Sequence, residues 1–108
     1  MDRQDNTAHG EYKIPGGKLV VVDLAIEDGR IGRVQVSGDF FLEPADALDV
    51  INAAVEGMPA DAGEDALAAA VTAALDPQTQ MYGITAGGVA VAVRRALDPD
   101  GAHGGGAV

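Results

Sequence analysis

Two turn signals near the N-terminus constrain the fold of this chain most strongly, because they separate three stretches rich in β-forming residues. The first signal is Pro-Gly-Gly at residues 15–17, and the second is Asp-Gly at residues 28–29. Both are typical of tight connections between neighbouring antiparallel strands. The sequence therefore predicts strands at residues 10–14, 18–27 and 30–37, joined as two hairpins.

The pairing of the second and third strands can be predicted from the side chains that must be buried. A three-residue loop at residues 27–29 places Val22 opposite Val34 and keeps aliphatic side chains on one face. The same loop places Asp23 opposite Arg33 on the other face, which is a favourable pair of charges. A two-residue loop would set polar side chains opposite buried valine and leucine. We therefore expect the three-residue loop.

Helices are predicted to follow the strands. Pro44 suits the first position of a helix at residues 44–56. Asp61 and Glu64 have the spacing of a capping box for a second helix, which extends to residue 75. The apolar residues of both segments recur at helical spacing, so each helix is expected to bury one face.

A third helix is predicted at residues 86–97, with Thr85 as its N-cap. The alternation in residues 89–93 is also compatible with a strand, and the pair Gly87-Gly88 disfavours a helix. The predicted fold class is α+β: a three-stranded antiparallel sheet followed by two to three helices packed on one face, in the order β-β-β-α-α-α. The expected core consists of Tyr12, Ile14, Val20, Val22, Leu24, Val34, Val36, Leu48, Ile51, Leu67 and Val71.

Composition excludes several classes of function. The chain carries 17 acidic and seven basic side chains, and its formal net charge of −10 disfavours binding to nucleic acid or to an anionic membrane. It contains no cysteine, which excludes disulfides, thiolate nucleophiles, zinc–thiolate sites and iron–sulfur ligation. We expect a cytoplasmic protein, because no apolar run could span a bilayer and the first residues are too polar for a signal peptide.

We expect one folded domain at residues 10–97, between a flexible N-terminus (residues 1–9) and a flexible tail (residues 98–108). The two histidines, His9 and His103, fall in these ends. We therefore interpret them as solvated side chains rather than metal ligands, and no metal site is predicted.

The first turn contains the leading candidate for ligand binding. Gly16 and Gly17 allow the backbone to approach a ligand closely, and Lys18 adds an ammonium group that suits a phosphate or carbonyl oxygen. Lys13 precedes the turn, and Lys13 and Lys18 are the only lysines of the chain. A plain hairpin turn accounts for the same residues, so both interpretations stay open at this point.

A second candidate is a contact surface for a partner protein. It comprises Asp39, Phe40 and Phe41, which follow the third strand. At least one phenylalanine is expected to fill the gap between the sheet and the first helix, and a second one left at the surface would mark the partner contact. Leu19 and Val21 should point away from the helices and add to this surface. The chain offers no complete catalytic set, so we assign no catalytic residue.

The order of these motifs resembles the small accessory domain of lipoate–protein ligases, especially the split ligases in which that domain is a separate polypeptide. The resemblance covers residues 11–97 and is most specific over residues 11–44. The residues that carry it are Lys-x-Pro-Gly-Gly-Lys at 13–18, Asp-Gly at 28–29, Ser-Gly-Asp-Phe-Phe at 37–41 and Pro44, followed by Leu48, Gly57 and the segment 82–85. The implied fold is similar to that of SufE and NifU-like proteins, which act through cysteine, so that similarity concerns the fold alone.

The resemblance implies an accessory subunit that is not catalytic alone and forms a heterodimer with the catalytic subunit of the ligase. The complex would use ATP, Mg and lipoate to form lipoyl-adenylate before transfer to a lysine of a lipoyl-domain protein, while the chain alone would bind no cofactor. Residues 16–18 and Lys13 would then lie near ATP. Two alternatives stay open: a stand-alone scaffold or binding domain without a role in lipoylation, and the detached end of a biotin-type ligase.

Overall fold

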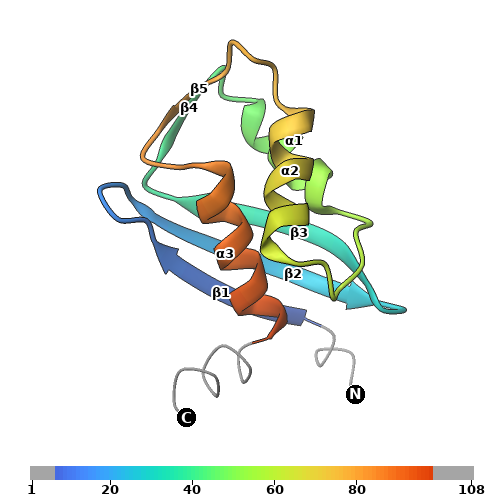
Figure 1. Ribbon diagram of the computed structural model, residues 1–108. Coiled ribbons are helices and arrows are strands. Elements are labelled where there is room, and N and C mark those ends of the chain that lie inside the picture. The colour runs from blue at the N-terminus through green and yellow to red at the C-terminus, as the bar shows by residue number, and fades with distance from the viewer. Residues whose placement is uncertain (1–6, 99–108) are drawn as a thin grey trace.

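The computed structural model describes residues 7–98 and shows a sheet with all three helices of this part of the chain on one face (Figure 1). The sheet is antiparallel, in the order β1-β2-β3, and comprises β1 (Thr7–Lys13), β2 (Leu19–Glu27) and β3 (Arg30–Gly38). The helices are α1 (Ala47–Val55), α2 (Glu64–Ala74) and α3 (Ala86–Leu97). The predicted fold class is therefore confirmed.

A second, two-stranded sheet was absent from the sequence-based prediction. It pairs β4 (Phe41–Glu43) with β5 (Gln80–Tyr82) in antiparallel register. Each strand has only three residues, too few to show the alternation by which strands are recognised in a sequence. The pairing attaches the chain after α2 to the segment that follows the main sheet.

The core lies between the main sheet and the helices. Alternate residues of β2 and β3 are buried there and meet one apolar face of each helix. Every residue of the predicted core belongs to this cluster, although Tyr12 and Leu48 are only partly buried. Gly10 allows α3 to cross β1 closely, because a Cβ atom there would lie 2.4 Å from the backbone oxygen of Ala92.

The predicted register between β2 and β3 is wrong by two residues, although the predicted faces are correct. Val22 lies opposite Val36, and Leu24 lies opposite Val34. The loop has two residues, Asp28 and Gly29, with φ angles of 54° and 77° that are typical of a type I′ turn.

A bulge removes the mismatch that a two-residue loop would otherwise create. The register shifts between Leu24 and Ile26, where Gly32 and Arg33 together oppose Ala25. This extra residue on β3 returns aliphatic side chains to the buried face. It also places Asp23 opposite Gln35, so the expected pair of Asp23 with Arg33 does not form.

Several predicted boundaries need correction. The first strand begins at Thr7 rather than residue 10, so residues 7–9 are strand and not part of a flexible N-terminus. The first helix begins at Ala47, because Pro44 belongs to a turn in which its carbonyl accepts from the Ala47 N–H. The expectations for residues 1–6 and 99–108 lie outside the described residues.

The predicted capping box of the second helix does not form. Gly63 is the N-cap of α2, and no side chain caps it. Asp61 lies instead in a turn that Arg94 holds through the carbonyl oxygens of Ala60 and Ala62. The third helix is confirmed together with its cap, since the Thr85 hydroxyl accepts from the Gly88 N–H.

Candidate functional site

The first hairpin turn rests on the loop between β5 and α3. The N–H of Lys18 donates to the carbonyl of Gly83 at 2.9 Å, and the N–H of Gly17 donates to the carbonyl of Ile14 at 2.8 Å. A Cβ atom on Gly17 would lie 2.9 Å from the Gly83 oxygen. The close contact between turn and loop therefore accounts for Gly17, and both N–H groups are used within the fold.

The stem of Lys18 lies across Gly83. A Cβ atom on Gly83 would be 2.5 Å from Cγ of Lys18, and the φ angle of +81° at Gly83 also favours glycine. Lys18 is exposed, and within residues 7–98 its ammonium group makes no hydrogen bond or ion pair. Lys13 instead donates to the carbonyl of Ile14, over a long 3.4 Å. Among the described residues, Lys18 is thus the lysine whose ammonium group has no hydrogen-bond partner.

An exposed aromatic pair lies on the neighbouring ribbon. Phe41 of β4 and Tyr82 of β5 are direct cross-strand partners, with ring centroids 5.7 Å apart. Phe41 is 56% exposed and Tyr82 is 48% exposed, whereas Phe40 packs against the core. Phe40 therefore faces inward, as expected of at least one phenylalanine, and is not available as a partner contact, whereas Phe41 faces solvent. Tyr82 immediately precedes Gly83, so β5 connects this pair to the turn.

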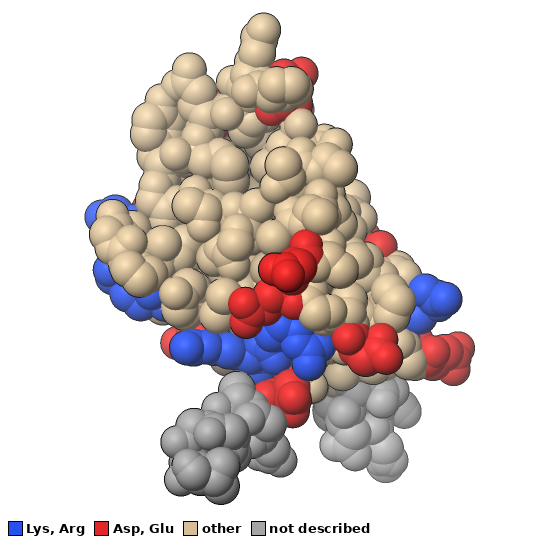
Figure 2. Space-filling view, in the orientation of Figure 1, with Lys and Arg blue, Asp and Glu red and all other residues tan. Residues whose placement is uncertain are grey.

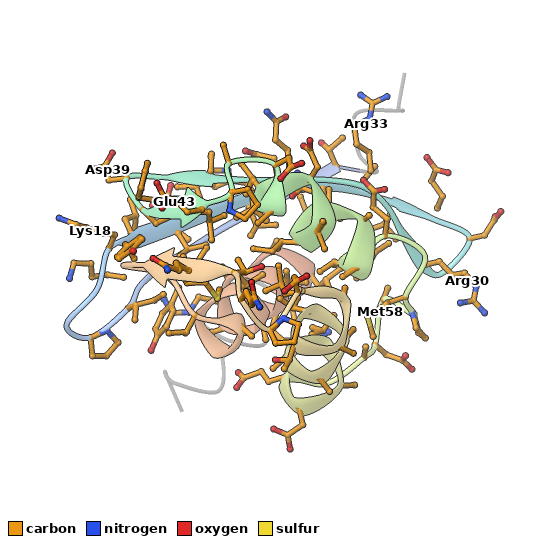
Figure 3. The ribbon with its side chains drawn as sticks, turned by 90° about the horizontal axis from the view of Figure 1, so that it is seen from above. Lys18, Arg30, Arg33, Asp39, Glu43 and Met58 are labelled. Atoms are coloured by element: carbon orange, nitrogen blue, oxygen red, sulfur yellow. The ribbon has the colours of Figure 1, made fainter. Side chains whose placement is uncertain are left out.

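Charged groups of both signs occupy this end of the molecule. Figure 3 shows Lys18, Asp39 and Glu43 together, at the end opposite Arg30 and Met58. Figure 2 shows that charged side chains gather along the sheet side, while the surface over the helices carries few. The exposed cation of Lys18 therefore lies at the same end of the molecule as these two acidic side chains.

We name this region the turn-end surface, comprising Lys13, Gly16, Lys18, Asp39, Phe41, Glu43 and Tyr82. Leu19, which is 39% exposed, and the partly exposed Val21 continue from it onto the open face of the sheet. No role was predicted from the sequence for Tyr82 or Glu43. Tyr82 could have been noticed as one of only four aromatic residues in the chain.

His9 is exposed to solvent, as expected, but its placement in a flexible end is wrong. His9 lies within β1, about half exposed, and its ring bonds to Asp23 and Glu11 at 2.7 and 2.8 Å. The hydrogen bond to Asp23, followed by that to Glu11, raises the pKa of His9. His103 lies outside the described residues. Among residues 7–98, no group of histidine, aspartate or glutamate side chains is arranged to hold a metal ion.

The helices of residues 7–98 include none with the length and apolar character needed to cross a membrane.

Comparisons with known proteins add one structural similarity. No protein-family model matches the chain, and no curated protein sequence matches it.

A solved structure does match, in a structural analysis of an archaeal lipoylation system from Thermoplasma acidophilum. That work describes a bipartite lipoate protein ligase and its E2 lipoyl domain. The matching chain is 19% identical, with a TM-score of 0.61, over 82% of this chain and 92% of that chain. At this level of identity, the similarity shows a shared fold.

Proposed function

We propose that this chain is the accessory subunit of a two-component lipoate–protein ligase, required with a catalytic subunit to activate lipoate to lipoyl-adenylate. The observation that carries the proposal is the fold shared, over most of both chains, with a component of an archaeal lipoylation system. The ordered motifs at residues 13–18, 28–29 and 37–41 support the same assignment independently. Transfer of the lipoyl group to a lipoyl-domain lysine would follow activation.

In this proposal the catalytic subunit binds lipoate, ATP and Mg, and this chain supplies a further cation. Lys18 suits that role because its stem packs on Gly83 while its ammonium group is exposed. A compact ammonium charge complements a phosphate oxygen of ATP or of the acyl-adenylate. The Gly17 and Lys18 N–H groups are already bonded within the fold, so the side chain rather than these amides would meet the substrate.

The proposed chemical effect of Lys18 is on the activation step. When lipoate attacks ATP, negative charge develops on the departing pyrophosphate. A positioned cation that meets this charge stabilises the transition state more than the ground state, and so increases the rate. Transfer from preformed lipoyl-adenylate releases no pyrophosphate and would not need Lys18.

The proposed partner contact is centred on Phe41 and Tyr82. Aromatic side chains are frequent anchors of protein–protein interfaces because they bury a large area with few rotatable bonds. Here both rings are about half exposed in a chain that contains only four aromatic residues. Leu19, Val21 and Asp39 would extend the contact, with the catalytic subunit as the other half of a heterodimer.

The assignment can be tested by co-expressing the chain with a candidate catalytic subunit, such as one encoded beside it. We expect the two proteins to co-purify and lipoyl-adenylate formation to depend on both. A pair that neither co-purifies nor differs in adenylation from the catalytic subunit alone favours a stand-alone scaffold or binding domain. Activation of biotin instead of lipoate would favour the biotin-type alternative.

The role of Lys18 has its own test, with Lys13 as the matched control. Lys18→Ala should leave folding and partner binding intact but slow adenylation at least roughly tenfold, equivalent to about 1.4 kcal/mol. Lys13→Ala should have a smaller effect, because Lys13 is bonded to the Ile14 carbonyl. Adenylation at the parental rate by a bound Lys18→Ala variant would show that the turn is structural and that the subunit activates its partner by another route.

A further inference from the structure

His9 joins two strands through both of its ring nitrogens. It lies directly opposite Asp23 of β2, and Glu11 follows two residues later on the same face of β1. Nδ1 of His9 is 2.7 Å from Oδ1 of Asp23, and Nε2 is 2.8 Å from Oε2 of Glu11. The ring is therefore held between a carboxylate of its own strand and one of the neighbouring strand.

This geometry requires a particular protonation state. An ionised carboxylate can only accept hydrogen bonds, so each ring nitrogen must carry a proton for both bonds to form. Only the imidazolium ion has protons on both nitrogens, and such charge-assisted bonds are short, as they are here. A neutral ring would donate one bond and direct a lone pair at the other carboxylate.

His9 and Asp23 border a hollow on the open face of the sheet, opposite the helices. Its volume is about 420 Å³, and the small side chain of Ala25 forms part of its floor. The charged side chains around His9 come from all three strands of the main sheet. They are Glu11 and Lys13 of β1, Asp23 and Glu27 of β2, and Arg33 of β3. From the helices, Arg95 of α3 donates to the Glu11 carbonyl oxygen.

We propose that His9, Asp23 and Glu11 form a proton-dependent latch, which strengthens the hold of β2 on the first described residues of β1 and loosens it when His9 loses its proton. The latch lies close to Thr7, the first described residue of β1. Loss of the proton would let these residues separate more often from the adjoining edge of β2, and it would change the charge around the hollow by one unit. The latch does not depend on the proposed function.

The direction of the pH effect follows from the pKa of His9, which the two carboxylates raise above its ordinary value of 6.5. The stabilisation of β1 is present in full below the ordinary value. It is lost as the pH rises through the raised value. Because His9 is about half exposed, we expect a modest effect, of the size found for exposed ion pairs.

The latch can be tested by following the His9 ring resonances of the full chain by NMR across a pH series. The His9→Gln variant distinguishes the signals of His9 from those of His103. Asp23→Asn and Glu11→Gln should each lower the titration midpoint of His9 relative to the parent. A midpoint unchanged in both variants would overturn the proposal, since the two carboxylates would then not hold the proton.

Hydrogen exchange supplies the second measurement. After correction for the intrinsic effect of pH, the protection of β1 amides should fall roughly two- to fivefold through the His9 titration. It should not change with pH in His9→Gln, and α3 amides serve as the internal control for global stability. Protection of β1 that is independent of pH in the parent would contradict the latch even if His9 titrates as expected.

Discussion

At Gly83, two properties of glycine are used at once. The φ angle of +81° strains any residue that has a Cβ atom, and the Lys18 stem occupies the space that this atom would need. Gly16 differs in one respect. Its φ angle of +76° is similar, but no heavy atom beyond its own and those of its two chain neighbours lies within 4 Å of the place of its Cβ. A Cβ atom at Gly16 would therefore cause backbone strain alone, whereas one at Gly83 would cause the same strain and also overlap with Lys18.

Gly16→Ala should cost about 1–2 kcal/mol of unfolding free energy, from the left-handed backbone alone. Gly83→Ala should cost more, because the Lys18 stem must also move. Urea unfolding of the two variants measures the difference, and it requires no partner protein. Equal losses would mean that the Lys18 stem gives way freely and is not fixed by Gly83.

At the scale of an element, α3 shows how one helix can contain adjacent glycines with different roles. Gly87 is exposed, and its nearest potential contact is the Thr85 hydroxyl at 4.0 Å. Gly88 is buried, and a Cβ atom there would lie 2.2 Å from Cδ1 of Ile14. Gly88 thus permits close packing between the helix and the first hairpin, whereas Gly87 has no such packing role.

Gly87→Ala should stabilise the protein by about 0.5–1 kcal/mol, because alanine loses less backbone entropy in a helix. Gly88→Ala should destabilise it by about 1–3 kcal/mol through the overlap with Ile14. Thermal melting of the two single variants compares them under identical conditions. A stabilising Gly88→Ala would show that Ile14 can repack without loss.

Contacts between α1 and β3 also protect the edge of the main sheet. The backbone N–H groups of Val34 and Val36 point outward from β3 and donate to the side chains of Glu56 and Asn52. These acceptors come from α1 and the residue that ends it. Unpaired edge donors can recruit a strand from another molecule, so this arrangement reduces that risk along β3.

At the scale of the whole molecule, one apolar core joins the sheet to all three helices of the described residues. Ile51 of α1 is fully buried in this core, while its neighbour Val50 is 37% exposed. The two residues share a helix and differ mainly in what surrounds them. They therefore provide a direct test of the assigned faces.

Ile51→Ala should lower the free energy of unfolding by about 2–5 kcal/mol, because it removes buried methyl groups and leaves a cavity. Val50→Ala should change it by less than about 0.5 kcal/mol. Denaturant unfolding of both variants provides the measurement. Similar losses at the two positions would contradict the packing of α1 described here.

The sequence by itself determined the features that depend on residues close along the chain. The alternation of β2 and β3 identifies their buried faces, and the glycines at 16–17 and 29 mark the turns. Thr85 identifies the start of α3 through a hydrogen bond to a residue three positions later. For the candidate site, the local pattern indicated Lys18 and predicted that at least one of the two phenylalanines would be buried.

The tertiary structure decided what depends on contacts between distant residues. Registers two residues apart put the same side chains on the same face, so alternation could not choose between the predicted pairing and the observed one, which has a bulge. Examples are the hydrogen bond between His9 and Asp23, the hydrogen bond between Lys18 and Gly83, and the pairing of Phe41 with Tyr82. Each contact forms only after the chain has folded back on itself, and no local preference encodes it.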